Sequence, residues 1–178
     1  MKHGGLMMRR IMRAILFLCA LLWAHDLTAQ ESPDLIFRKS TDFKLLTPND
    51  KLATYGIDDP LIDGLVCYYT AHEKGGVAGM FGVAEQTSEV SLSCNQHGPI
   101  KFKDKFSQGD SVFSERRSLL FKRMQIVRGC DVKRNILVYM VYSDRLIDGS
   151  PESSTSTVVI TPWGGQGPAP RCGDFVRN

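Results

Sequence analysis

Short runs of alternating apolar and polar residues constrain the fold of this chain more than any other feature of its sequence. Leu65–Tyr69 is rich in β-branched and aromatic residues, and Val90–Cys94 alternates apolar with small polar side chains. Two further apolar runs, 119–128 and 136–142, flank a polar pause at 131–135, which predicts a hairpin. No run of ten or more residues shows a clean helical period, so we expect few and short helices.

Two more segments have strand character. Ile100–Phe106 places three lysines on one face and apolar side chains on the other, a pattern that suits a sheet edge. Residues 155–161 form another strand candidate, which Pro162 ends. We therefore predict a mainly β protein, or an α+β protein with little helix, built as a single antiparallel β-sandwich or incomplete barrel with disulfides.

The N-terminal segment is typical of a secretory signal peptide. Basic side chains without an acid precede an apolar run of eleven residues at 14–24, and Ala29 follows at cleavage distance. The apolar run is too short for a bilayer span, which needs about 20 residues. We predict that residues 1–29 are removed after Ala29 and that the protein is exported and released with no stable membrane anchor.

Removal of this segment changes the charge of the chain. It takes four of the 22 basic and one of the 19 acidic side chains, so 18 of each remain and the formal net charge falls from +3 to zero. A neutral chain has no overall field to steer it onto nucleic acid, so we expect no nucleic-acid partner. The remaining length of about 149 residues suits one domain.

Four cysteines remain after the signal segment: Cys67, Cys94, Cys130 and Cys172. In an oxidising compartment an even count indicates disulfides, and four cysteines allow three connectivities, among which the sequence alone does not choose. The tail, residues 164–178, is rich in glycine and proline and has little to bury. We expect it to be disordered unless Cys172 tethers it.

Many short motifs recur in an order that resembles the CreA family of small bacterial periplasmic proteins. The resemblance spans roughly Leu35 to Trp163 and predicts a CreA-like domain over 30–163, with 164–178 as an extension. The motifs are Cys67-Tyr68, Gly75-Gly76-Val77, Ala84-Glu85-Gln86-Thr87-Ser88, Ser93-Cys94, Gly98-Pro99-Ile100, Ser118-Leu119-Leu120-Phe121-Lys122, Gln125-Ile126-Val127-Arg128, Asp131-Val132-Lys133-Arg134-Asn135, Tyr139, Tyr142-Ser143-Asp144, Gly149-Ser150-Pro151 and Pro162-Trp163.

The resemblance implies export to the periplasm of a Gram-negative bacterium and supplies no established biochemical activity. It also implies that Cys67 and Cys94 belong to the family pattern, whereas Cys130 and Cys172 are additions. We therefore predict the pairs Cys67–Cys94 and Cys130–Cys172. The second pair would pin the tail to the hairpin turn.

Most of the candidate binding residues lie in or next to a basic region between Arg116 and Arg134, which holds seven basic side chains and one acid. If several of them share a face, an anionic ligand could bind through charge-assisted hydrogen bonds. A solvated strand face balanced by acids from elsewhere explains the same cluster more simply, because strands alternate sides. The candidates are Arg128, Asp131, Lys133, Arg134, Asn135 and Asp144.

Known catalytic and metal motifs are weak or missing. The chain has no Gly-x-Ser-x-Gly and no Cys-x-x-Cys, and its glycine-rich segment 75–82 lacks the lysine of a phosphate loop. The best zinc candidate would combine the first two cysteines with His72 and His97. Export favours oxidation of those thiols, and the family pattern has no histidine at either position, so we predict no metal and no cofactor.

Three classes of function remain. We favour a non-catalytic periplasmic binding or accessory protein of the bacterial envelope, whose partner is an unknown envelope component or an anionic ligand. The first alternative is an enzyme of unfamiliar chemistry that uses Asp144, Asp58 or Glu85, although Asp58-Asp59 before Pro60 is also a common turn. The second is a structural or chaperone-like module that works through strand edges.

Overall fold

The computed structural model describes residues 32–42, 45–46, 48–76, 90–116, 122–145, 152–165 and 167–177. Within these ranges no helix is long and apolar enough to cross a membrane. The elements are β1 (Asp34–Ser40), β2 (Lys51–Asp59), β3 (Ile62–Glu73), β4 (Val90–Phe102), β5 (Asp110–Arg116), β6 (Lys122–Asp131), β7 (Ile136–Arg145), β8 (Ser153–Val159) and the 3-10 helix η1 (Cys172–Phe175).

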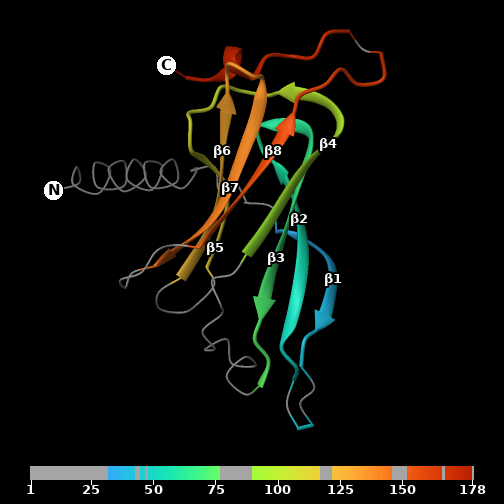
Figure 1. The fold of residues 1–178 in the computed structure, drawn as a ribbon, viewed down its shortest axis with the longest axis vertical. Coiled ribbons are helices and arrows are strands. Elements are labelled where there is room, and N and C mark those ends of the chain that lie inside the picture. The colour runs from blue at the N-terminus through green and yellow to red at the C-terminus, as the bar shows by residue number, and fades with distance from the viewer. Residues whose placement is uncertain are drawn as a thin grey trace, which may run out of the picture. The chain divides into compact units, whose positions relative to one another are not determined.

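The strands form two four-stranded antiparallel sheets, in the orders β1-β2-β3-β4 and β5-β6-β7-β8 (Figure 1). Each strand pairs with its neighbour in the sequence, so each sheet is a meander made from one continuous part of the chain. This arrangement confirms the predicted mainly β, antiparallel fold.

The two sheets share one hydrophobic core. In β3 the side chains of Leu65, Cys67 and Tyr69 are buried, and alternate residues are more exposed, as expected for a strand with one face inward. The ring of Tyr69 contacts the ring of Phe113 in the other sheet, with 5.8 Å between centroids. The inner faces of the sheets therefore pack against each other.

Along one side, β4 and β8 bring the sheets together through side chains. The backbone N–H of Cys94 donates to Ser156 Oγ at 2.8 Å, and Gln96 bonds both backbone groups of Thr161 at 3.0 Å. These hydrogen bonds, each of which involves a side chain, join two strands that belong to different sheets. The result fits the predicted sandwich or incomplete barrel.

β4 joins two segments that the sequence pattern separates, 90–94 and 100–106. Its register against β3 shifts between Asp63, which faces Lys101, and Leu65, which faces Gln96. Gly64 makes this bulge possible: its φ is +80°, and a Cβ there would lie 2.3 Å from the carbonyl oxygen of Pro99. The strand ends at Phe102 rather than Phe106, which instead forms an isolated bridge with Val176.

The sequence pattern does not indicate β1, β2 or β5. β1 is exposed along its whole length, so it has no buried face to create an alternating pattern. β2 contains Gly56 and two adjacent aspartates, which are uncommon in strands. β5 is seven residues long and has two consecutive buried residues, Val112 and Phe113, at a register shift.

Disulfides join Cys67 to Cys94 and Cys130 to Cys172. The first links residues that face each other on β3 and β4. The second links the end of β6 to η1 in the tail. Both pairs are the predicted ones.

Cys172 tethers the tail as predicted, but it is not the only anchor. The side chain of Asn135 donates to the carbonyl of Pro170 at 3.0 Å and accepts from the N–H of Cys172 at 2.8 Å. The ring of Phe175 stacks on Phe102 at 4.3 Å. An amide side chain and an aromatic pair therefore add anchors that composition does not reveal.

Candidate functional site

A buried ion pair connects the two sheets near the turn between β2 and β3. Arg128 Nη1 in β6 donates to Asp59 Oδ1 in β2 at 2.7 Å, and the two side chains are 2% and 0% exposed. The hydroxyl of Tyr139 in β7 donates to Asp59 Oδ2 at 2.8 Å. Asp59 therefore accepts hydrogen bonds from two strands of the opposite sheet.

The local sequence explains how Asp59 enters the interior. Successive side chains of β2 point to opposite faces, so Asp58 is exposed while Asp59, like Ile57, is buried. The N–H of Leu61 donates to Asp59 Oδ1 at 2.8 Å across Pro60, which forms the turn that the sequence predicts. The two aspartates therefore face different surroundings and do not form a carboxylate pair.

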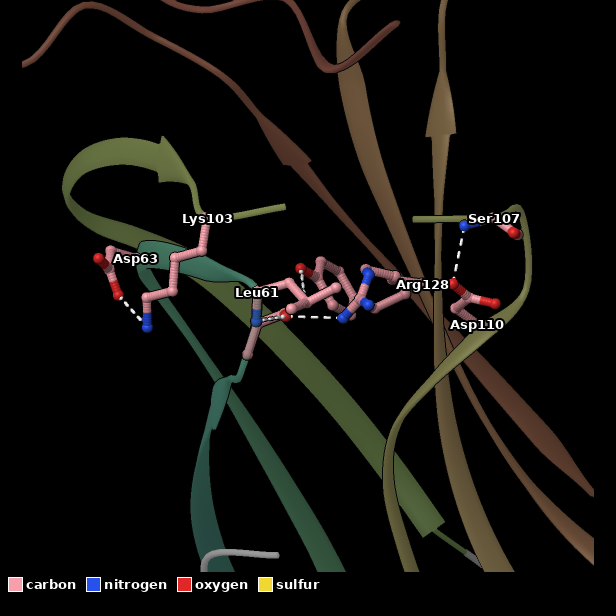
Figure 2. A network of polar contacts seen from close by, with 8 residues as sticks. Leu61, Asp63, Lys103, Ser107, Asp110 and Arg128 are labelled. Carbon is pink, nitrogen blue, oxygen red and sulfur yellow. Dashed lines mark hydrogen bonds and ion pairs between the residues drawn. The ribbon is translucent and has the colours of Figure 1, made fainter. Parts of the chain in front are cut away.

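Arg128 is enclosed by further contacts. Its guanidinium carbon lies 5.2 Å from the centre of the buried Phe106 ring, within range of a cation–π interaction. Figure 2 shows Arg128 and Leu61 between two outlying contacts, Lys103 with Asp63 and Ser107 with Asp110. Arg128 therefore belongs to the core of the protein rather than to a surface that a ligand could reach.

Tyr139 acts as a hydrogen-bond donor in this network. Burial raises the pKa of its hydroxyl, and the neighbouring charge of Asp59 raises the pKa further. The hydroxyl therefore keeps its proton over the ordinary pH range. Arg128 Nε is buried and has no hydrogen-bond partner among the described residues, so the network leaves one donor unsatisfied.

The turn between β6 and β7 presents the exposed part of the predicted site. Arg134 Nη1 lies 2.8 Å from Asp131 Oδ2, and the N–H of Arg134 donates to Asp131 Oδ1 at 3.1 Å. The hydrogen bond from the Arg134 side chain lowers the pKa of Asp131. Lys133 is exposed beside them.

Asn135 links this turn to the tail. Its φ is +57°, in the left-handed region that asparagine tolerates better than most residues, and its side chain makes the two bonds to Pro170 and Cys172 described above. Those bonds fix the backbone on both sides of Arg171, which is exposed. We call Lys133, Arg134 and Arg171 the basic corner.

The basic residues between Arg116 and Arg134 do not gather at one place, because they are spread between the two ends of β6. Arg123 pairs in register with Arg116 and Asp144, eight positions before Asp131. At about 3.3 Å per residue this is a separation of about 26 Å. Asp144 is therefore remote from the basic corner. Its side chain, together with Glu85 and Arg117, lies outside the part of the chain that the structure describes.

A second polar cluster fixes the edge of the first sheet. Arg38 in β1 binds Glu73 in β3 with both nitrogens, Nε at 2.7 Å and Nη2 at 3.0 Å. Tyr55 in β2 also donates to Glu73, and burial is the main cause of a raised pKa of Tyr55. The ring of Tyr55 stacks on Tyr69 at 5.3 Å. The bond from Arg38 to Glu73 therefore attaches β1 to β3, across the strand β2 with which β1 pairs through its backbone.

The described residues contain no group of three or more histidine, cysteine, aspartate or glutamate side chains that could hold a metal ion. Cys67 and Cys94 are bonded to each other, so they do not present thiolates beside His72 and His97. The sequence analysis did not include Arg171 among the candidates, because Arg171 lies in the tail beyond the basic region. The predicted Cys130–Cys172 pair was the one signal that could have found it.

A family model described as CreA protein matches residues 36–163. The chain belongs to the CreA family. Protein CreA of Escherichia coli K12 is 42% identical over 127 residues, which cover 69% of this chain and 81% of that protein. The CreA proteins of Escherichia coli O6:H1 and O157:H7 show the same identity and coverage. No solved structure matches the chain.

The match to the CreA family model covers only part of the residues described above. It includes Asp59, Arg128 and Tyr139, so the buried network lies within the CreA region. It ends at residue 163, before Arg171 and Cys172. The basic corner is therefore built from a CreA turn and a segment beyond the family match.

Proposed function

We propose that this CreA protein is exported to the periplasm and acts there as a non-catalytic binding or accessory protein of the bacterial envelope. The basic residues, the apolar run and Ala29 in the first 29 residues support export. Two disulfides that join all four later cysteines suit an oxidising compartment. Binding to an anionic ligand or envelope component takes place at the basic corner.

The attachment of Asn135 to the tail is the observation that carries this proposal. Two hydrogen bonds and the Cys130–Cys172 disulfide hold the turn and the tail together. Exposed cations on a preorganised surface lose little freedom when a ligand binds, so more of their interaction energy appears as affinity. Charge-assisted hydrogen bonds to phosphate, sulfate or carboxylate groups are the expected contacts.

The interior charges favour binding over catalysis. Asp59 and Arg128 are nearly inaccessible and are bonded to each other, and the proton of Tyr139 is held by a buried hydrogen bond. Groups that are bonded to one another in the core are not presented to a substrate. The exposed cations at the β6–β7 turn are accessible to a partner.

Binding to a polyanion probe tests the basic corner. Fluorescent dextran sulfate should bind the exported protein at low salt, and the Lys133→Ala/Arg134→Ala variant should bind at least about tenfold more weakly. Its melting temperature should hardly change, because exposed charges contribute little stability. The Arg171→Ala variant should also weaken binding.

The matched control removes two exposed lysines elsewhere, in the variant Lys101→Ala/Lys105→Ala. It should leave the affinity for dextran sulfate within about twofold of the parent. This small change measures the general effect of losing two positive charges. Equal losses in both double variants would contradict recognition at the basic corner. Recovery of a periplasmic protein that still carries residues 1–29, judged by intact mass, would contradict the proposed processing, which leaves Gln30 first.

A further inference from the structure

β1 is an edge strand with an unusual surface. It is the end strand of the first sheet and pairs with β2 on one side, while its other edge faces no strand of the described chain (Figure 1). Leu35, Ile36 and Phe37 are consecutive and 44%, 52% and 56% exposed. Edge strands are usually protected by charges or prolines along their length, so three exposed apolar residues in a row indicate an interaction surface.

The apolar surface continues onto β3. Ile36 and Tyr68 both border Gly56, since Ile36 Cδ1 and Tyr68 Cε1 lie 3.5 Å and 3.4 Å from the place where a Cβ of Gly56 would be. Tyr68 is itself 38% exposed. Because Gly56 has no side chain, both larger side chains pack over it, on the side of the sheet that Phe37 also faces through its pairing with Thr54.

This edge is held firmly in position. The bidentate bond between Arg38 and Glu73 ties β1 across β2 to β3. β1 is therefore presented as a preformed template for a further strand, which lowers the cost of ordering it on binding.

Pairing with β2 determines which way the side chains of β1 point. Asp34, Phe37 and Lys39 face Gly56, Thr54 and Leu52, whose side of the sheet is the outer one that carries Tyr68. Leu35 and Arg38 face Tyr55 and Ala53 on the inner side. The register shifts at Ile36, whose side chain lies toward Tyr68 on the outer side.

We propose that β1 pairs with β1 of a second copy of this protein, antiparallel and about a twofold axis. Asp34 lies opposite Lys39 of the partner subunit, Leu35 opposite Arg38 of the partner subunit, and Ile36 opposite Phe37 of the partner subunit. In this register each pair lies on one face of the joined sheet. A register centred on Phe37 would instead place Asp34, on the outer side, opposite Ser40, on the inner side.

Charge complementarity selects a second copy as the occupant. Asp34 begins the strand and Lys39 lies near its end, so twofold pairing creates two opposite-charge pairs across the junction. The exposed Ile36 and Phe37 side chains cover each other between them. The result is an eight-stranded sheet, with each basic corner elsewhere on its own subunit. This dimer goes beyond the binding function proposed above and does not depend on it.

Sedimentation equilibrium of the exported protein tests the dimer. The parent protein should sediment as a dimer in the micromolar range. Phe37→Lys should raise the dimer dissociation constant at least about tenfold, because it removes an apolar contact and adds charge next to Lys39. A parent protein that is monomeric at about 100 µM, or a dimer that Phe37→Lys leaves intact, would overturn the proposal.

Charge-reversal variants test the register. Recovery in the combined variant distinguishes a specific loss of dimerisation from misfolding. Asp34→Lys and Lys39→Asp should each weaken the dimer about tenfold, since each places like charges opposite one another at two positions. The combined variant Asp34→Lys/Lys39→Asp should restore the parent affinity. Lys105→Asp, an exposed reversal away from the edge, should have no effect. Failure of the combined variant to recover dimerisation, while its melting temperature matches the parent, would refute the register.

Discussion

Asp59 and Arg128 form an ion pair in the interior of the protein, where the cost of removing both charges from water is several kcal/mol for each ion. Hydrogen bonds from Leu61 and Tyr139 to the same carboxylate offset part of that cost. A pair of this kind contributes little net stability, but the loss of one partner leaves the other charged and buried. Its value lies in specifying how the two sheets face each other.

Substitution of Arg128 should therefore be costly. We expect Arg128→Met to lower the free energy of unfolding by about 3–5 kcal/mol, because it leaves the Asp59 carboxylate without its cation. Urea unfolding measures this change. The matched control Arg134→Met removes an exposed arginine and should cost less than about 1 kcal/mol. Similar small losses for both variants would show that Arg128 is dispensable in the core.

Asp131 should titrate below the usual range of an aspartate, because the Arg134 side chain bonds its charged form. NMR detection of the carboxyl carbon measures its pKa, and Arg134→Ala should raise that pKa toward the ordinary value. Since the pKa is lowered in the folded state, the stabilising contact is present above the unfolded-state pKa and is lost as pH falls through the folded-state value. An unchanged midpoint in Arg134→Ala would contradict this coupling.

Among the elements, the β6–β7 hairpin was the most predictable from sequence, because its two apolar runs flank a polar turn at 131–135. The sequence also indicated the central part of β3, the two ends of β4 and most of β8. The predicted Cys130–Cys172 pair indicated that the tail meets the turn. The sequence could not indicate β1, whose seven residues are all exposed, or the hydrogen bonds of Asn135 to residues 170 and 172. Local patterns record burial on one face, and these features lack such a face or depend on distant partners.

The two disulfides act on elements of different kinds. Cys67–Cys94 joins neighbouring core strands across a separation of 27 residues, and on the chain-entropy model such a closure contributes roughly 3.5 kcal/mol. Cys130–Cys172 spans 42 residues and contributes roughly 4 kcal/mol on the same model, but it attaches a tail that can detach without opening the sheets.

Removal of each bridge should therefore give different results. We expect Cys67→Ala/Cys94→Ala to lower the melting temperature of the whole domain, measured by calorimetry. Cys130→Ala/Cys172→Ala should instead increase tryptic cleavage near Arg171 and leave the sheets folded, because the remaining contacts of the tail with Asn135, Phe102 and Phe106 hold it more weakly. Global unfolding of the second variant at room temperature would show that the tail is part of the cooperative core.

For the whole molecule, short alternating runs were sufficient to predict an antiparallel β fold, since a strand with one buried face leaves a period of two in its sequence. They were not sufficient to place the charges. Arg128 lies in a basic stretch, and nothing near it in the sequence shows that its partner, Asp59, is 69 residues away. The candidate site was therefore predicted in part: Lys133, Arg134 and Asn135 do lie together, whereas Arg128 is internal and Asp144 lies at the far end of β7.

The connectivity of the cysteines affects how such a chain matures. Both bridges join cysteines that are consecutive among the four beyond residue 29. A chain that crosses a membrane with its N-terminus first delivers Cys67 and Cys94 before Cys130, so the earliest thiols to meet are native partners. Cys172 arrives last, when Cys130 is the remaining thiol. Under the export proposed above, oxidation in order of arrival would give the native bonds directly, without an exchange of partners.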